Sequence, residues 1–235
     1  MKSTILREID YPESDGKPMA ETPLHMLVMW NTIQTLIDWF ADDPKVYVWG
    51  NMMLYYVEGD IKKTVAPDVF VVKGVDKHKE RRVFKTWEEK SPKLVIEATS
   101  RKTRKVDLGD KKDRYLNELK VPEYFLFDPL GEYIKAKLRG YRLQGGQYEE
   151  IEAIDGRLPS KVLGLHLEAV GKELRLWDPK SQKYRLTPDE KHAKLQREFF
   201  ATLDDVQKQR EEIERLRREN EALKQQAKRG NGGAT

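Results

Sequence analysis

The sequence predicts an α/β (α+β) fold: a mixed sheet core flanked by helices, with an antiparallel β-layer and a C-terminal coiled-coil helix. The first observation is a strand–helix–strand pattern over residues 93–129, which implies a parallel strand pair with a right-handed crossover. The second is a series of short strand-like runs between residues 131 and 187, separated by Gly, Pro and Asp turns. The third is a charged stretch that contains no glycine from residue 188 until Gly230.

The expected organisation is one folded domain with an extension. A chain of 235 residues can bury one good core and carry an appendage. Residues 1–187 form the predicted domain, residues 188–229 the C-terminal helix or coiled coil, and residues 230–235 a disordered tail.

Composition excludes several kinds of site. The chain has no cysteine, which excludes disulfides, thiolate metal sites and cysteine nucleophiles. Its four histidines are scattered, so a histidine-based metal cluster is not expected. The 44 Lys and Arg residues outnumber the 40 Asp and Glu residues, a balance that permits binding to a polyanion without requiring it. Because no signal-peptide pattern and no run of about 20 apolar residues occurs, a soluble cytoplasmic protein is expected.

The N-terminal part predicts one helix and then four strands. Residues 21–43 carry apolar side chains at helical spacing, with Thr22 as the N-cap and Pro23 at the first helical position. The first three strands are "KVYVWG", "NMMLYYVEGD" and "TVAPDVFVVKG", and a charged loop separates them from the fourth, "KLVIEATS". A helix over "KVDLGDKKDRYLNELK" then leads to the strand "VPEYFLFDP".

Two acids stand beside apolar strand segments: Asp68 precedes "VFVV" and Glu97 follows "LVI". If the two strands are neighbours, their Cα atoms can lie about 5 Å apart. Carboxylates that close repel each other unless a cation neutralises them. Mg²⁺, a hard ion that prefers oxygen ligands, suits this pair and supports phosphoryl displacement. Spacing alone leaves a second interpretation open, in which both acids form structural ion pairs.

Basic residues follow Glu97 in the sequence. Lys111 or Lys112, one turn into the predicted helix, could reach back to orient a nucleophile or stabilise a pentacovalent phosphate. Two basic clusters, residues 73–82 and 100–112, flank the predicted site; such runs are usually solvated surfaces, but they also fit a phosphate backbone. The residues predicted to contact nucleic acid are Lys102, Arg104, Lys105 and Lys112.

Four segments in order, "VAPDVFVV", "PKLVIEATS", "DLGDKKDRY" and "VPEYFLFDP", resemble the Uma2 (DUF820-type) family of endonucleases, which belongs to the PD-(D/E)xK nuclease superfamily. The similarity extends from Glu21 to the C-terminal helix and covers most of the chain. It implies a restriction-endonuclease-like core in residues 1–187 and an endodeoxyribonuclease that uses Mg²⁺ or Mn²⁺.

The resemblance also implies roles for individual residues. Asp68 and Glu97 correspond to the metal ligands, with the carbonyl of Ala98 as a third ligand. Glu21 and His25, on the first predicted helix, are candidates for auxiliary residues near the site.

The lysine of the superfamily motif is displaced in this chain. The usual motif places a lysine two residues after the acid, where this sequence has Thr99. The resemblance implies that the following helix supplies it instead, because Lys111 stands at the matching place, four residues before Tyr115.

The C-terminal stretch carries a heptad pattern that predicts a parallel homodimer. Leu216 and Leu223 occupy d positions, and the a positions are Phe199, Val206, Ile213, Asn220 and Ala227. The g and e positions, which face each other on parallel partners, carry opposite charges: Glu212 and Glu219 against Arg217 and Lys224. A solvated single helix and a helix docked on its own domain are the alternatives.

Three hypotheses follow from the sequence. The first is a metal-dependent DNA endonuclease that acts as a homodimer. The second is a nucleic-acid-binding or assembly protein that keeps the nuclease fold without efficient catalysis, which the Thr99 substitution favours. The third is a coiled-coil interaction module in which Asp68 and Glu97 form ordinary ion pairs.

Overall fold

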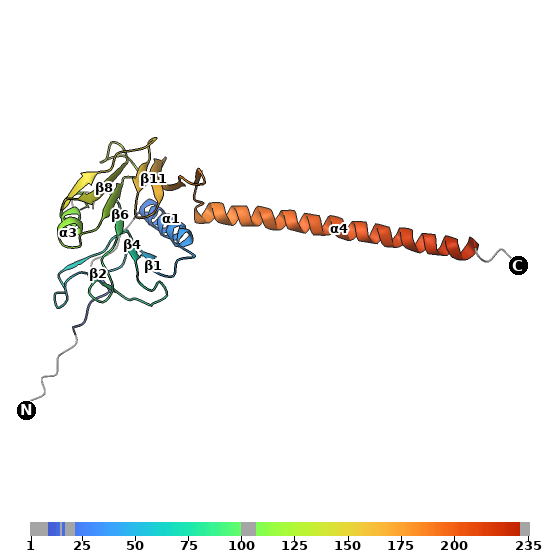
Figure 1. Ribbon diagram of the computed structural model, residues 1–235, viewed down its shortest axis with the longest axis horizontal. Coiled ribbons are helices and arrows are strands. Elements are labelled where there is room, and N and C mark those ends of the chain that lie inside the picture. The colour runs from blue at the N-terminus through green and yellow to red at the C-terminus, as the bar shows by residue number, and fades with distance from the viewer. Residues whose placement is uncertain (1–8, 15, 17–21, 100–106, 231–235) are drawn as a thin grey trace, which may run out of the picture. The chain divides into compact units, whose positions relative to one another are not determined.

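A six-stranded mixed sheet forms the centre of the first compact unit, Met1–Thr187. This computed structural model describes residues 9–14, 16, 22–99 and 107–230. The strand order is β1-β4-β6-β7-β8-β9 (Figure 1). The strands are β1 (Val46–Trp49), β4 (Val69–Lys73), β6 (Leu94–Ala98), β7 (Glu123–Phe127), β8 (Leu138–Gln144) and β9 (Gln147–Glu150). β6 and β7 are parallel and the other neighbours antiparallel, which confirms the pair predicted from the strand–helix–strand pattern.

Helices pack on both faces of this sheet. α1 (Pro23–Trp39) shares a buried core with one set of alternate side chains of the strands. On the other face, the π-helical turn η1 (Asp107–Lys111) leads into α3 (Lys112–Asn117), whose Tyr115 is buried in a second core. The central strands β4, β6 and β7 are runs of consecutive buried, mostly apolar residues. Because alternate side chains of a strand point to opposite faces, both faces of the sheet are apolar and need a cover. Figure 1 shows α1 and α3 on either side of β6.

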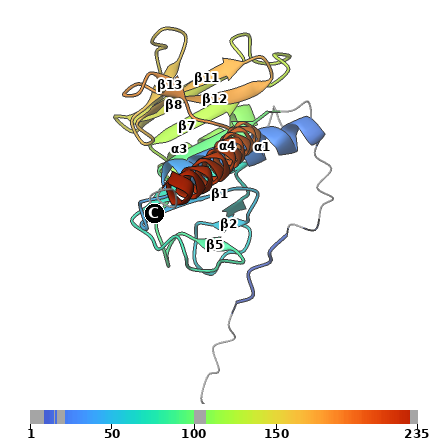
Figure 2. The same ribbon diagram turned by 90° about the vertical axis from the view of Figure 1, so that its right-hand side faces the viewer.

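Two smaller sheets complete the unit. The four-stranded antiparallel sheet consists of β10 (Leu158–Ser160), β11 (Leu165–Val170), β12 (Glu173–Asp178) and β13 (Lys183–Tyr184). Its buried leucines join the core around α1. The three-stranded sheet consists of β3 (Thr64–Val65), β2 (Leu54–Tyr55) and β5 (Phe84–Lys85). Figure 2 shows these two sheets at opposite ends of the unit.

The predicted fold class is confirmed, with corrections in detail. Thr22 caps α1, because its hydroxyl accepts a hydrogen bond from the N–H of His25 at 3.2 Å. The segment 131–187 is not one antiparallel layer: β8 and β9 extend the six-stranded sheet, since the backbone groups at the edge of β7 need a partner strand. The strand β5 lies inside the segment expected to be a charged loop, and it is only two residues long.

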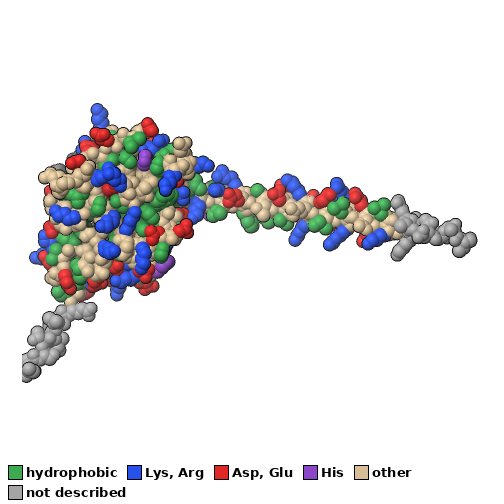
Figure 3. All heavy atoms as spheres, viewed as in Figure 1, with side chains coloured by type: hydrophobic (Ala, Val, Ile, Leu, Met, Phe, Trp, Pro, Cys, Tyr) green, Lys and Arg blue, Asp and Glu red, His purple; other side chains and the backbone are tan. Residues whose placement is uncertain are grey.

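The second unit contains one helix, α4 (Pro188–Gly230), of 43 residues. The apolar residues of the predicted heptad seam are 44–65% exposed on this helix: Phe199, Val206, Ile213, Leu216 and Leu223. Figure 3 shows hydrophobic side chains among charged ones along α4. Within the described part of the chain, no helix is long and apolar enough to cross a membrane.

Candidate active site

The two acids singled out in the sequence lie at the adjoining ends of paired strands. β4 and β6 are antiparallel with Val69 opposite Ile96. In the same register, Asp68 and Glu97 stand opposite each other, one position beyond that pair. The Asp68 N–H donates a hydrogen bond to Glu97 Oε2 at 3.4 Å, and the Ala98 N–H donates one to Asp68 Oδ2 at 2.8 Å. Each carboxylate is therefore held by the backbone of the other strand.

Each acid also contacts a basic side chain. His25 Nε2, on α1, lies 3.3 Å from Asp68 Oδ1, and Lys111 Nζ, at the end of η1, lies 2.9 Å from Glu97 Oε2. The Glu97 side chain is fully buried, whereas that of Lys111 is 18% exposed. A buried carboxylate needs a basic hydrogen-bond donor beside it, because an isolated charge away from water is very unfavourable.

Lys111 and Tyr115 reach the same carboxylate because they are four residues apart, the spacing that places two side chains on one helix face. The Tyr115 hydroxyl donates a hydrogen bond to Glu97 Oε1 at 2.6 Å, while Lys111 contacts Oε2. The lysine ends the π-helical turn η1, and such turns are rare and frequently occur at functional sites. In the sequence, Tyr115 only marks the spacing from Lys111, and its contact with Glu97 is seen only in the structure.

The protonation states at the site follow from burial and from these contacts. Burial raises the pKa of the Asp68 carboxyl, but the hydrogen bond from His25 and the positive charge of Lys111 outweigh burial, so this pKa lies below its ordinary value. Burial, and then the negative charge of Glu97, raise the pKa of the Tyr115 hydroxyl well above its ordinary value. At neutral pH Asp68 is therefore ionised, and Tyr115 is a hydrogen-bond donor.

Gly50, which stands between two predicted strands, supports the site and was not among the residues predicted from the sequence. A Cβ at Gly50 would lie 1.8 Å from the carbonyl oxygen of Asp68 and 2.9 Å from Cδ1 of Ile33. The next residue, Asn51, donates its N–H to the carbonyl of Pro67 at 2.8 Å. Only glycine permits this close approach, which fixes the backbone that carries Asp68.

The other predicted residues are placed as follows. Lys112 points to the ring of Tyr141, with Nζ 3.6 Å from its centroid, a cation–π contact. Ala98 contributes its N–H to the site, and the role of its carbonyl as a metal ligand stays a prediction. The predicted roles of four further residues also stay predictions, because these residues lie outside the described part of the chain: Glu21, Lys102, Arg104 and Lys105.

The donor set fits one hard divalent ion. Asp68 and Glu97 are adjacent, and Mg²⁺ is usually held by one or two carboxylates, with waters and substrate phosphate as the remaining ligands. In the chain as described, no group of three or more His, Cys, Asp and Glu side chains has the arrangement of a metal site. The fit therefore rests on the two carboxylates alone.

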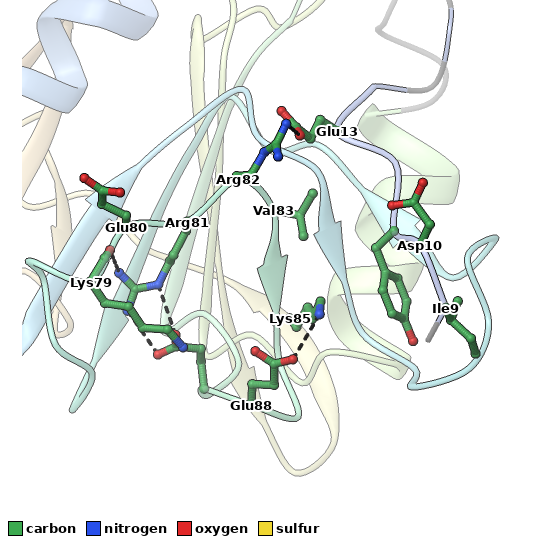
Figure 4. A pocket seen from close by; sticks show the side chains of 12 residues that line it. Ile9, Asp10, Glu13, Lys79, Glu80, Arg81, Arg82, Val83, Lys85 and Glu88 are labelled. Carbon is green, nitrogen blue, oxygen red and sulfur yellow. Dashed lines mark hydrogen bonds and ion pairs between the residues drawn. The ribbon is translucent and has the colours of Figure 1, made fainter. Parts of the chain in front are cut away.

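A cavity of about 430 Å³ lies elsewhere in the unit, between the N-terminal segment and residues 79–89. Figure 4 shows that charged groups on its wall pair with one another, Arg82 with Glu13 and Lys85 with Glu88. None of the predicted catalytic residues lines it. Because basic and acidic groups of its wall pair within the protein and no predicted catalytic residue lies there, the candidate site remains the one at β4 and β6.

Comparison with known proteins identifies similar proteins without assigning roles to these residues. The family model for Uma2, described as "Putative restriction endonuclease", matches residues 6–176, which confirms the resemblance predicted from the four motifs. The comparison with curated proteins found no match. One solved structure similar to this chain is a "putative nuclease belonging to DUF820" from Anabaena variabilis. Its TM-score is 0.47 at 17% sequence identity, over 65% of this chain and 81% of its own.

Proposed function

Because this chain belongs to the Uma2 family, whose model matches residues 6–176, we propose that it is a Mg²⁺-dependent endonuclease that hydrolyses DNA phosphodiester bonds. The observation that carries the proposal is the cluster of Asp68, Glu97 and Lys111 at the adjoining ends of β4 and β6. Two carboxylates beside an ammonium are the groups that this hydrolysis needs, namely oxygen ligands for an ion and a cation near the developing negative charge.

Each residue of the cluster has a distinct role in the proposal. Asp68 and Glu97 would hold Mg²⁺ or Mn²⁺, an ion that supplies an activated water and stabilises charge on phosphate. The Lys111 ammonium would orient the attacking water and stabilise the phosphate oxygens. His25 keeps Asp68 ionised and oriented through their 3.3 Å contact. The DNA backbone would be contacted by Lys102, Arg104, Lys105 and Lys112.

A second candidate function is a nuclease fold without efficient catalysis, which binds nucleic acid or assembles with partners. Two observations favour it. Thr99 stands where the superfamily motif usually has lysine, and both acids already have basic partners, His25 and Lys111, within the protein. These contacts would also neutralise a pair of purely structural carboxylates. Cleavage therefore separates the nuclease from this second function, and metal binding separates it from a structural protein.

Dimerisation through α4 is part of the proposal. Five large apolar residues of the predicted seam are at least 44% exposed on this helix: Phe199, Val206, Ile213, Leu216 and Leu223. A helix with an apolar stripe gains stability by burying the stripe against another helix. A second copy of α4 fits this stripe, because Glu212 and Glu219 at g positions would face Arg217 and Lys224 at e positions in a parallel pair. Two nuclease units in one dimer could then cut both DNA strands.

The test is cleavage of supercoiled plasmid by the full chain in Mg²⁺ and in Mn²⁺. Wild type is compared with Asp68→Asn, Glu97→Gln and Lys111→Met, which change charge with little change in size. Lys63→Met is the control, because Lys63 forms an ion pair of the same length with Glu118, 2.9 Å, which is exposed to solvent and includes none of these three residues. We expect nicking or linearisation by wild type and by the control, and loss of about 10²-fold or more in the three site variants.

The outcomes separate the candidate functions. Wild-type protein that binds DNA tightly and in a salt-dependent manner but does not cut it would support the nuclease fold without efficient catalysis. Protein that neither cuts DNA nor binds DNA or metal ions would leave a coiled-coil structural protein. Cleavage that survives in Asp68→Asn and Glu97→Gln would show that a different site, or a contaminant, is responsible.

A further inference from the structure

Tyr115 touches the proposed nuclease site but is not one of its predicted catalytic residues. Its side chain is fully buried, and its hydroxyl donates a hydrogen bond to Glu97 Oε1 at 2.6 Å. Lys111 Nζ contacts the other oxygen, Oε2, at 2.9 Å. Because Tyr115 and Lys111, from one helical segment, each bind one oxygen of the Glu97 carboxylate, together they fix the rotation of this carboxylate about its Cγ–Cδ bond.

An aromatic cluster anchors the Tyr115 hydroxyl. The Tyr115 ring lies 5.2 Å from that of Tyr124, which in turn stacks on Tyr141 at 6.3 Å and on Tyr148 at 6.1 Å. Buried rings in contact have few rotamers available, whereas the partly exposed lysine chain has several rotatable bonds. Of the two donors, the tyrosine is therefore the one whose position does not depend on a flexible side chain.

We propose that Tyr115 is a positioning residue of the nuclease site, whose hydroxyl holds Glu97 in the orientation that directs Oε2 toward Asp68 and Lys111. This inference rests on the proposed function, because it assigns Tyr115 a role only through Glu97. Outer groups that orient a metal-binding side chain typically contribute about 10–100-fold to metal affinity or activity. The alternative is that Tyr115 only packs, in which case its hydroxyl has no effect on the site.

The test compares Tyr115→Phe with Tyr148→Phe in the full chain. Both changes remove one hydroxyl from the same aromatic cluster, but the Tyr148 hydroxyl donates to the carbonyl of Val121 at 2.9 Å and not to the site. The first measurement is the Mn²⁺ dissociation constant by titration calorimetry without DNA. The second is the dependence of plasmid cleavage on Mn²⁺ concentration, and melting curves show that each variant is folded.

We expect Tyr115→Phe to bind Mn²⁺ about 10–100-fold more weakly, with cleavage that recovers as the Mn²⁺ concentration is raised. Tyr148→Phe should match wild type in both. Equal Mn²⁺ affinity in wild type and Tyr115→Phe would overturn the inference, and so would unfolding of Tyr115→Phe alone, because its role would then be structural. If wild type itself neither binds Mn²⁺ nor cuts DNA, the proposed function fails and the inference fails with it.

Discussion

Replacing Lys111 by methionine should destabilise the metal-free protein, because it leaves a buried carboxylate without its cationic partner. Glu97 has a fully buried side chain and lies 2.9 Å from Lys111 Nζ. Removing one member of a buried ion pair costs about 3–5 kcal/mol. The low end, about 3 kcal/mol, applies here, since the Tyr115 hydroxyl and the Asp68 N–H continue to donate to Glu97.

The corresponding melting temperature should fall by roughly 6–12 °C, at about 2–4 °C per kcal/mol for a unit of this size. The double variant Lys111→Met, Glu97→Gln should recover part of this loss, because no unpaired charge then remains in the interior. Addition of Mg²⁺ should raise the melting temperature of Lys111→Met more than that of wild type, since a bound ion replaces the missing positive charge.

The assay is thermal unfolding at pH 7, in EDTA and again in Mg²⁺, with Lys63→Met as the control for an exposed ion pair. That control should melt close to wild type. The reasoning is refuted if Lys111→Met melts at the wild-type temperature, or if the double variant is less stable than Lys111→Met alone. A Mg²⁺ shift of the same size in both proteins would contradict the placement of the ion beside Glu97.

Three further predictions concern other parts of the chain. Burial raises the pKa of Glu89, but the hydrogen bonds and the positive charges of Arg81 and Lys79 together outweigh burial and leave the pKa lowered. The stabilisation that Glu89 provides should therefore be present above about pH 4.5 and lost as the pH falls through the folded-state pKa. Urea midpoints of wild type and Glu89→Gln should therefore converge in acid, and parallel curves would contradict this. Glu123→Gln should lower the free energy of unfolding by about 3–5 kcal/mol, because the buried carboxylate accepts two hydrogen bonds from Arg142. If urea unfolding shows a loss under about 1 kcal/mol, Glu123 and Arg142 do not behave as a buried ion pair. Ile213→Asp, at an a position, should convert a dimer to a monomer in analytical ultracentrifugation, and a wild-type monomer would disprove the dimer.

The elements with strong local signals were predictable from the sequence. Helix α1 has a cap, a proline at its first position and an apolar face, so local chemistry specifies where it begins. The parallel pair β6 and β7 follows from the strand–helix–strand order, because a helix between two strands is the usual connection of parallel neighbours. The two-residue strand β5 was not predictable, because its pairing with β2 joins segments about thirty residues apart and no alternation marks it.

At the site, the residue types and the adjacency of the two acids were predictable, whereas the contacts of Tyr115 and Gly50 were not. Asp68 and Glu97 stand out because acids beside apolar strand runs are unusual, and the strand register then brings them together. The contact of Tyr115 with Glu97 depends on how η1 and α3 pack on the sheet, which is a tertiary property. No local pattern shows that Gly50 serves the site, since the requirement for glycine comes from the Asp68 backbone, more than ten residues away in the chain.

The usual motif places a lysine at position 99, whereas in this chain Lys111 on the helical segment stands in its place. The last prediction tests whether cleavage requires the ammonium group to come from the helix, or whether an ammonium group at position 99 also suffices. Thr99 donates its N–H to the Phe127 carbonyl at 2.7 Å, so the β6–β7 pairing continues to it, and strand alternation places its side chain on the same face as that of Glu97. Its hydroxyl is buried and has no hydrogen-bond partner in the described part of the chain. A lysine at this position would therefore direct its chain toward the face on which Lys111 now lies.

We expect Thr99→Lys, introduced into Lys111→Met, to restore cleavage by about 10-fold or more over Lys111→Met alone, as a positioned ammonium would. Thr99→Met in the same background is the control, because it adds similar bulk without charge and should restore nothing. In the wild-type background Thr99→Lys should lower activity, since two ammonium groups beside Glu97 repel each other. The opposite result would be that the Thr99→Lys, Lys111→Met protein folds and binds Mn²⁺ but is as inactive as the Thr99→Met, Lys111→Met control. The ammonium group must then come from the helix, where Tyr115 and Lys111 together hold Glu97.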